Sequence, residues 1–122
     1  MTSFVRTIRG SESSEYVEDI LGRIDSAIPL PFIPTRAMAG DFVYLAYSGR
    51  IVGRARIRSL RPHEAEVAIG SQRKRMQARC IIELDGQWQV PNRQISFQGA
   101  QGIRYVDRIG YSGIDTEKWG FA

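Results

Sequence analysis

The sequence predicts a mixed α+β fold that is mainly β: a small, partly closed antiparallel β-barrel with one N-terminal helix. Five or six short segments alternate apolar and polar residues, which is typical of half-buried strands. One early segment has helical spacing instead, and the connections between segments are long and polar. With 122 residues and 43% hydrophobic content, the chain is expected to form a single domain over residues 1–122.

The N-terminal third predicts a strand, a helix and an extended connector, in that order. Alternation over Ser3–Arg9 indicates the first strand. From Ser14 to about Ser26 the apolar residues recur at helical spacing, behind N-cap candidates at residues 11–14. Three prolines interrupt Ile28–Pro34, so this segment is expected to be an extended connector packed against the body.

Residues Gly40–Arg61 predict a β-hairpin. Apolar and polar residues alternate in both arms, and Ser48-Gly49 between the arms is a turn signal. The return arm carries an arginine at every second position on one face, with apolar residues on the other. These arginines are Arg54, Arg56 and Arg58. One face of the hairpin must be buried, so its arginines and its aromatic residues need not serve the same ligand.

The second half of the chain predicts more strands. They are expected at Glu64–Ile69, Ala78–Leu84, Gln87–Val90 and Gly102–Ile109. Residues Gly70–Gln77 are expected to form a basic loop or short turn. Asp85-Gly86 is a tight-turn signal and predicts a second hairpin. The tail, Gly110–Ala122, has no clear period.

Composition excludes several classes of protein. Cys80 is the only cysteine and His63 the only histidine, which excludes an internal disulfide and a multi-histidine metal site. No stretch approaches the ~18 apolar residues of a membrane span, and the N-terminal residues lack the apolar core of a secretory signal. The chain is therefore expected to be cytoplasmic, without metal, cofactor or membrane partner. Cys80 is expected to pack as a small hydrophobe and His63 to be an exposed polar residue.

Positive charge is concentrated in the middle of the sequence. The net charge is +4, but residues 50–79 hold nine bases and two acids. Fifteen of the seventeen bases are arginine, whose planar fork fits phosphate and stacks on bases. This segregation favours a nucleic-acid binder. The alternative is a set of surface arginines that serve solubility and ion pairs.

Aromatic and amide side chains provide candidates for contacts with a base. Trp88 lies between two glutamines, and stacking a base on an exposed ring is worth about 1–3 kcal/mol. Amide side chains are frequent over Asn92–Gln101 and can read base edges. The preferred site is a cleft between Trp88, this amide-rich segment and the arginines of the hairpin, with Tyr44 nearby. Alternatively, Trp88 covers one end of the barrel.

Three segments lie in and before the predicted hairpin: Pro34-Thr35-Arg36, Gly40–Leu45 and Arg50–Ile57. Together they resemble the PUA-like superfamily, which includes ASCH and EVE domains. The resemblance implies a pseudo-barrel with a cleft beside the helix that holds nucleic acid, either RNA or a modified or flipped base. Some small ASCH-like members are amidohydrolases that act on acylated cytidine and use a lysine near the Gly-Asp hairpin. In this chain Arg36 occupies the position where that lysine would be expected, and an arginine cannot lose its proton to act as a base.

The predicted function is therefore a nucleic-acid-binding module for RNA or modified-base DNA. Phosphates would lie on the arginine-rich face, and a base would enter an adjacent pocket. The alternatives are a small hydrolase acting on a modified nucleoside and a protein-interaction module. The nucleic-acid site is expected at Arg36, Tyr44, Arg50, Arg54, Arg56, Arg58, Arg73, Lys74, Arg75, Arg79, Trp88, Asn92 and Arg93. No catalytic or metal-binding residue is predicted.

Overall fold

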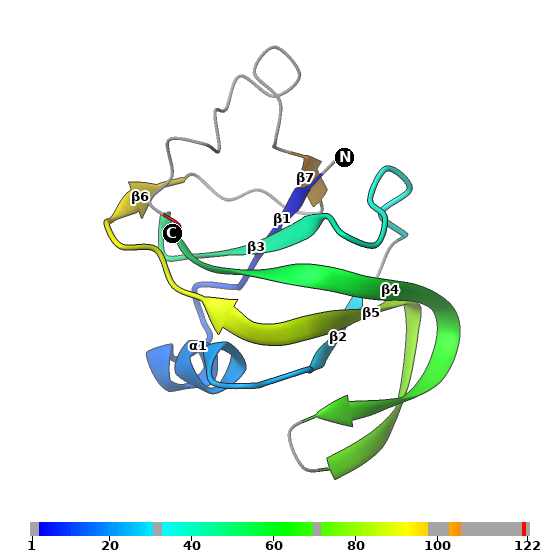
Figure 1. Ribbon diagram of the computed structural model, residues 1–122. Coiled ribbons are helices and arrows are strands. Elements are labelled where there is room, and N and C mark those ends of the chain that lie inside the picture. Colours follow the sequence, from blue (N-terminus) through cyan, green and yellow to red (C-terminus); the bar gives the residue numbers. More distant parts are fainter. Residues whose placement is uncertain (1–2, 31–32, 70–71, 98–102, 106–120, 122) are drawn as a thin grey trace.

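The computed structural model describes residues 3–30, 33–69, 72–97, 103–105 and 121, with side chains described over 3–30, 33–61, 78–97 and 121. The fold is mainly β, with one short helix and a single sheet that curls into a half-barrel (Figure 1). The elements are β1 (Phe4–Thr7), α1 (Ser14–Leu21), β2 (Ala27–Leu30), β3 (Phe42–Tyr47), β4 (Arg50–Ile69), β5 (Gln72–Gln89), β6 (Ile95–Ser96) and β7 (Ile103–Tyr105). No helix in the described part of the chain is long and apolar enough to cross a membrane.

The sheet joins distant parts of the chain. Its strand order is β2-β5-β4-β3-β1-β7, and the short β6 pairs with the start of β4. All neighbours are antiparallel except β1 and β3, which run parallel with Phe4 opposite Val43. The connection between β1 and β3 includes α1, which lies against one side of the sheet in Figure 1.

The predicted hairpin of β3 and β4 is confirmed. Tyr47 pairs with Arg50 across a two-residue turn, in which Ser48 and Gly49 have φ angles of 53° and 80°. Positive φ angles at both central residues are what a type I′ hairpin turn requires. The arginine face of β4 is confirmed as well, because Ala55 and Ile57 between the arginines are buried.

Two expectations for the second half are wrong. Residues 72–77 form the start of β5 rather than a loop, since Gln72 pairs with Ile69 and the ladder continues from there. The hairpin expected at Asp85-Gly86 does not form, because β5 runs on through both residues. Asp85 lies opposite Arg56 and Gln89 opposite Arg54, so the strand carries a bulge in which Gly86 has a φ of 69°.

Helix α1 is shorter than its sequence pattern. Ser13 caps it by accepting a hydrogen bond from the Tyr16 amide at 3.2 Å, and Gly22 ends it. The chain then turns at Asp25, whose φ is 47°, and enters β2. This strand contains Pro29, which the edge position of β2 tolerates.

Two apolar cores lie on opposite faces of the sheet. The first is beneath α1 and contains Val43 and Leu45 of β3. The second lies on the other face and contains Tyr44 and Ala46, with Phe121 packed against it. Both faces of β3 are therefore buried, whereas the sequence required burial of only one.

Candidate functional site

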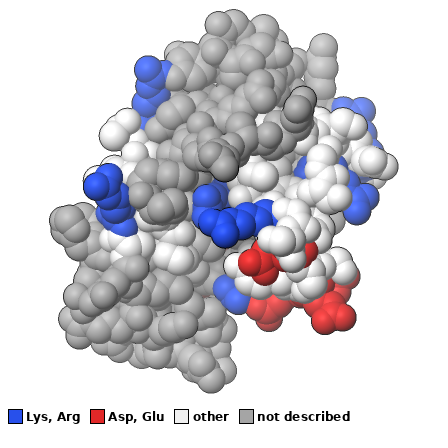
Figure 2. Space-filling view, turned by 180° about the vertical axis from the view of Figure 1, so that it is seen from behind, with Lys and Arg blue, Asp and Glu red and all other residues white. Residues whose placement is uncertain are grey.

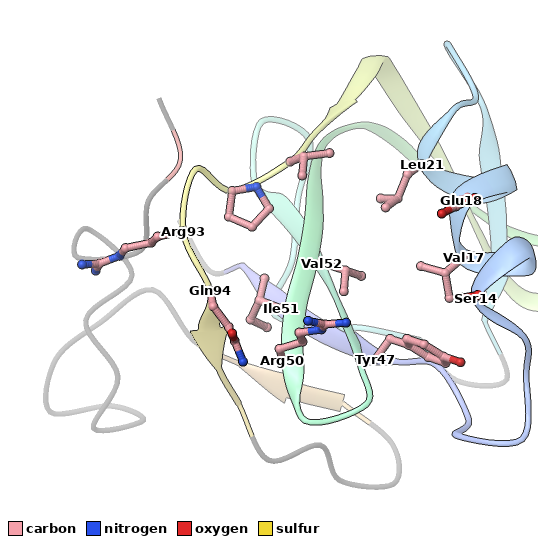
Figure 3. Close-up of a pocket in the computed structure, with 12 residues that line it drawn as sticks. Ser14, Val17, Glu18, Leu21, Tyr47, Arg50, Ile51, Val52, Arg93 and Gln94 are labelled. Atoms are coloured by element: carbon pink, nitrogen blue, oxygen red, sulfur yellow. The ribbon is translucent and has the colours of Figure 1, made fainter.

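A pocket of about 400 Å³ lies between α1, the β3–β4 turn and the segment that follows β5 (Figure 3). Six of the side chains that line it are aliphatic. They are Val17, Leu21, Ile51, Val52, Val90 and Pro91. Val90 is 63% exposed, so the pocket is open to solvent on this side. We refer to this open pocket with its aliphatic lining as the slot.

One face of α1 forms a wall of the pocket. Residues Ser14, Val17, Glu18 and Leu21 line it and share a face because they recur at helical spacing. Leu21 packs closely over β4: a Cβ atom on Gly53 would overlap Leu21 Cδ2. The absence of a side chain at Gly53 therefore lets the helix approach the sheet and sets the width of the slot.

Polar groups surround the slot. Figure 3 shows Arg50 and Tyr47 at one end, Glu18 on the helix side, and Arg93 pointing away from the helix. The Tyr47 hydroxyl donates a hydrogen bond to the Glu12 carbonyl at 2.6 Å, which fixes the ring. These groups could hold the edges of a flat ligand whose faces lie against the aliphatic walls.

The structure brings two predicted site residues, Arg50 and Arg93, to this pocket, with the exposed Asn92 next to Arg93. Tyr47 also lines the pocket, as do two polar residues of α1, Ser14 and Glu18. These three were not predicted from the sequence. Helical periodicity places the two α1 residues on one face. It does not reveal which strands that face meets.

Arg54 and Arg56 form a stack with aromatic rings on the opposite face of the sheet. The Arg54 guanidinium carbon lies 4.3 Å from the Phe42 ring centroid and 4.6 Å from that of Phe121. The Arg56 guanidinium carbon lies 4.6 Å from the same Phe42 centroid. Arg54 Nε also donates to Gln89 Oε1 at 2.6 Å, and Arg56 Nη1 donates to the Gly40 carbonyl at 3.1 Å. Both guanidinium groups are therefore held in place without an acidic partner in these contacts.

Arg58, the third arginine of this face, is paired with acids. Its Nε lies 2.5 Å from Asp85 Oδ1, and its Nη2 lies 3.0 Å from Asp25 Oδ1. The hydrogen bond to Asp85 raises the pKa of the Arg58 guanidinium. Arg61 is paired in the same way with Glu83. On the face shown in Figure 2, basic side chains lie in several separate groups, and acidic ones gather beside one of them. The charge segregation of the sequence is thus partly compensated in space.

Trp88 and Tyr44 are not available to a base. Trp88 is 4% exposed and belongs to the core beneath α1, whereas its neighbour Gln89 contacts Arg54 on the other face. The expected cleft between Trp88 and the arginines is therefore not formed. Tyr44 is 3% exposed and packs edge-on against Phe121, with ring centroids 5.7 Å apart.

The remaining predicted residues are scattered. Arg36 and Arg79 are exposed and do not line the pocket. The side chains of Arg73, Lys74 and Arg75 lie outside the described residues. Cys80 is buried among apolar side chains, as expected of a small hydrophobe. Over the ranges described, no three His, Cys, Asp or Glu side chains gather as metal ligands would.

Comparison of the chain with protein-family models, curated proteins and solved structures gave no match. The chemistry of the site is therefore argued from its own geometry. That geometry is an apolar slot with a carboxylate on one side and a guanidinium at one end, which suits a flat ligand with polar edges.

Proposed function

We propose that this chain is a nucleic-acid-binding module of the PUA-like kind, which takes a base into the pocket beside α1. The observation that carries the proposal is the pocket itself. Its volume of about 400 Å³ falls in the range of small-ligand sites. It also lies beside the helix, where the resemblance to PUA-like domains implies nucleic acid.

The slot suits a base because its walls are aliphatic and its polar groups are at the edges. A planar ring would lie between Leu21 on the helix and Val90 and Pro91 on the opposite wall. Burial of the ring faces gives affinity for any base, whereas the edge groups distinguish one base from another.

Phosphates would lie at the rim of the slot and beyond it, on arginines that have no acidic partner in the described part of the chain. Arg93 lines the pocket with its side chain directed away from the helix, and Arg54 is held by Gln89, the residue before Val90. Arg54 and Arg56 lie on the other face of the sheet, so a strand leaving the pocket would reach them by passing over the end of β5 at Val90. Because stacking and hydrogen bonds already order these side chains, little rotamer entropy is lost when they bind phosphate.

The experiment is fluorescence anisotropy with short labelled single-stranded RNA and DNA, at salt concentrations from about 50 to about 200 mM. Affinity should fall steeply with salt, because phosphate contacts release counterions. Arg93→Gln and the double variant Arg54→Gln/Arg56→Gln each remove arginines that would bind phosphate. The slope of log K against log salt should become shallower by about 0.7 for each phosphate that is no longer neutralised. Affinity that is independent of salt would contradict the proposal.

Two controls separate the charges from the pocket. Arg61→Gln removes an arginine of the same strand whose charge Glu83 already offsets, so its salt slope should match that of the wild type. Val52→Phe narrows the slot and should weaken binding about tenfold with an unchanged slope. Full affinity in this variant would place the base elsewhere.

A further inference from the structure

Two groups of opposite charge line the pocket, and neither has a partner among the residues that the structure describes. Glu18 and Arg50 both line the slot, yet in the part of the chain that the structure describes they form no ion pair or side-chain hydrogen bond. The neighbouring acid Asp19 differs, since Arg23 Nη2 donates to it at 2.6 Å. Glu18 is therefore the acid of α1 that lines the pocket, and its carboxylate has no partner among the described residues.

From this pair we infer that the pocket selects guanine. The inference rests on the proposed function and specifies which base that site takes. A carboxylate only accepts hydrogen bonds, and its two oxygens match two adjacent donors. Among the four common bases, guanine alone presents two adjacent donors on its Watson–Crick edge, at N1 and N2. Single-stranded RNA exposes this edge to proteins.

Arg50 suits the other polar edge of the same base. Guanine O6 and N7 are both acceptors, and a bidentate arginine is their commonest partner in protein–DNA complexes. The pocket thus offers an acceptor group for the donor edge and a donor group for the acceptor edge. The aliphatic walls between them fit the ring.

The other bases match the hydrogen-bonding groups of Glu18 and Arg50 less well. Uracil places two carbonyl oxygens around its single N–H, and these would meet the Glu18 carboxylate. Adenine and cytosine each place an acceptor nitrogen beside their amino group. Cytosine is the nearest competitor, because a carboxylate can accept from its N4 amino group.

The test uses four single-stranded oligonucleotides that differ at one central position, which is G, A, C or U in an otherwise identical uracil tract. The wild type should bind the G-containing strand about tenfold more tightly than the all-uracil strand. In Glu18→Gln, which replaces one acceptor with a donor, this ratio should fall below about threefold. Glu15→Gln is the matched control, since Glu15 lies on the same helix outside the pocket. Circular dichroism verifies that each variant is folded.

The outcomes separate the two proposals. Equal binding of all four strands, or a preference for cytosine, would overturn guanine selection and leave nucleic-acid binding intact. A guanine preference that persists in Glu18→Gln would overturn the assignment to this pocket. The absence of binding to any of the four strands would overturn both proposals.

Discussion

Gly53 determines how closely α1 approaches the sheet. A Cβ atom at this position would overlap Leu21 Cδ2 and would lie 3.3 Å from the Gln89 carbonyl oxygen. Leu21 can shift, but the carbonyl belongs to the backbone of β5. A methyl group here would therefore push the helix wall of the pocket outward.

Gly53→Ala should lower the free energy of unfolding by about 1–3 kcal/mol, as overpacked cores do. Urea denaturation measures the change. Gly10→Ala is the control, because a Cβ at Gly10 meets no atom within 4 Å. Equal stability of the two variants would show that Leu21 moves without cost.

Cys80 gives stability a pH dependence at the alkaline end. It is 2% exposed, and burial raises the pKa of its thiol. The unfolded thiol loses its proton at lower pH than the folded one, so above about pH 8.5 the unfolded state binds fewer protons. The stabilisation linked to this thiol is therefore fully present below about pH 8.5. Above that pH, the free energy of unfolding should fall as pH rises. Urea unfolding at pH 7 and about pH 10 should show a smaller fall in Cys80→Ala than in the wild type.

Trp88 shows why a residue's sequence neighbours mislead in a strand. Gln87 and Gln89 flank it and suggest an exposed ring, but adjacent strand residues face opposite sides of the sheet. The environment of Trp88 is set by residues of α1 and β4, which are distant in sequence. For the same reason Glu18 could be placed on a helix face in advance, but its location in one pocket with Arg50 could not.

At the scale of elements, α1 is a helix of eight residues that carries one wall of the pocket. A helix this short is marginal alone, so its cap and its packing against the sheet determine its stability. The Ser13 hydroxyl satisfies one of the backbone amides that the first turn leaves without a partner.

Ser13→Ala should therefore cost about 1 kcal/mol in thermal or urea unfolding. The same variant should weaken oligonucleotide binding, since fraying of the first turn displaces Ser14 from the pocket. Asn caps helices about as well as Ser, so Ser13→Asn should retain both stability and binding. A Ser13→Asn variant as unstable as Ser13→Ala would contradict the role of the cap.

Turn signals predicted one hairpin correctly and the other wrongly, for a physical reason. Ser48-Gly49 and Asp85-Gly86 both adapt the backbone to a positive φ. A tight turn and a β-bulge share this requirement, so the dipeptide alone does not distinguish them. The partner strand does: β4 extends past Asp85-Gly86 and keeps β5 paired on both sides of the bulge.

At the scale of the whole molecule, the mainly β class with one early helix was predictable from periodicity. The curl of the sheet and the two cores were not, because they depend on pairings between distant strands. The distribution of charge in the folded chain also depends on contacts between distant segments. The bases of residues 50–79 are close in sequence, but Asp25, Glu83 and Asp85 offset two of them in the folded chain. This leaves Arg54 and Arg56 as the arginines of that face whose described contacts are with rings, an amide and a carbonyl.

The position of β1 between β3 and β7 has a consequence for how the chain folds. One neighbour of Phe4 is Val43 and the other is Tyr105, so the two sides of β1 are completed by segments far apart in sequence. Closing such a long loop is entropically costly, and topologies of this kind fold slowly. Until β7 arrives, β1 presents an open edge on which a second molecule can pair. Refolding yield should therefore fall as protein concentration rises.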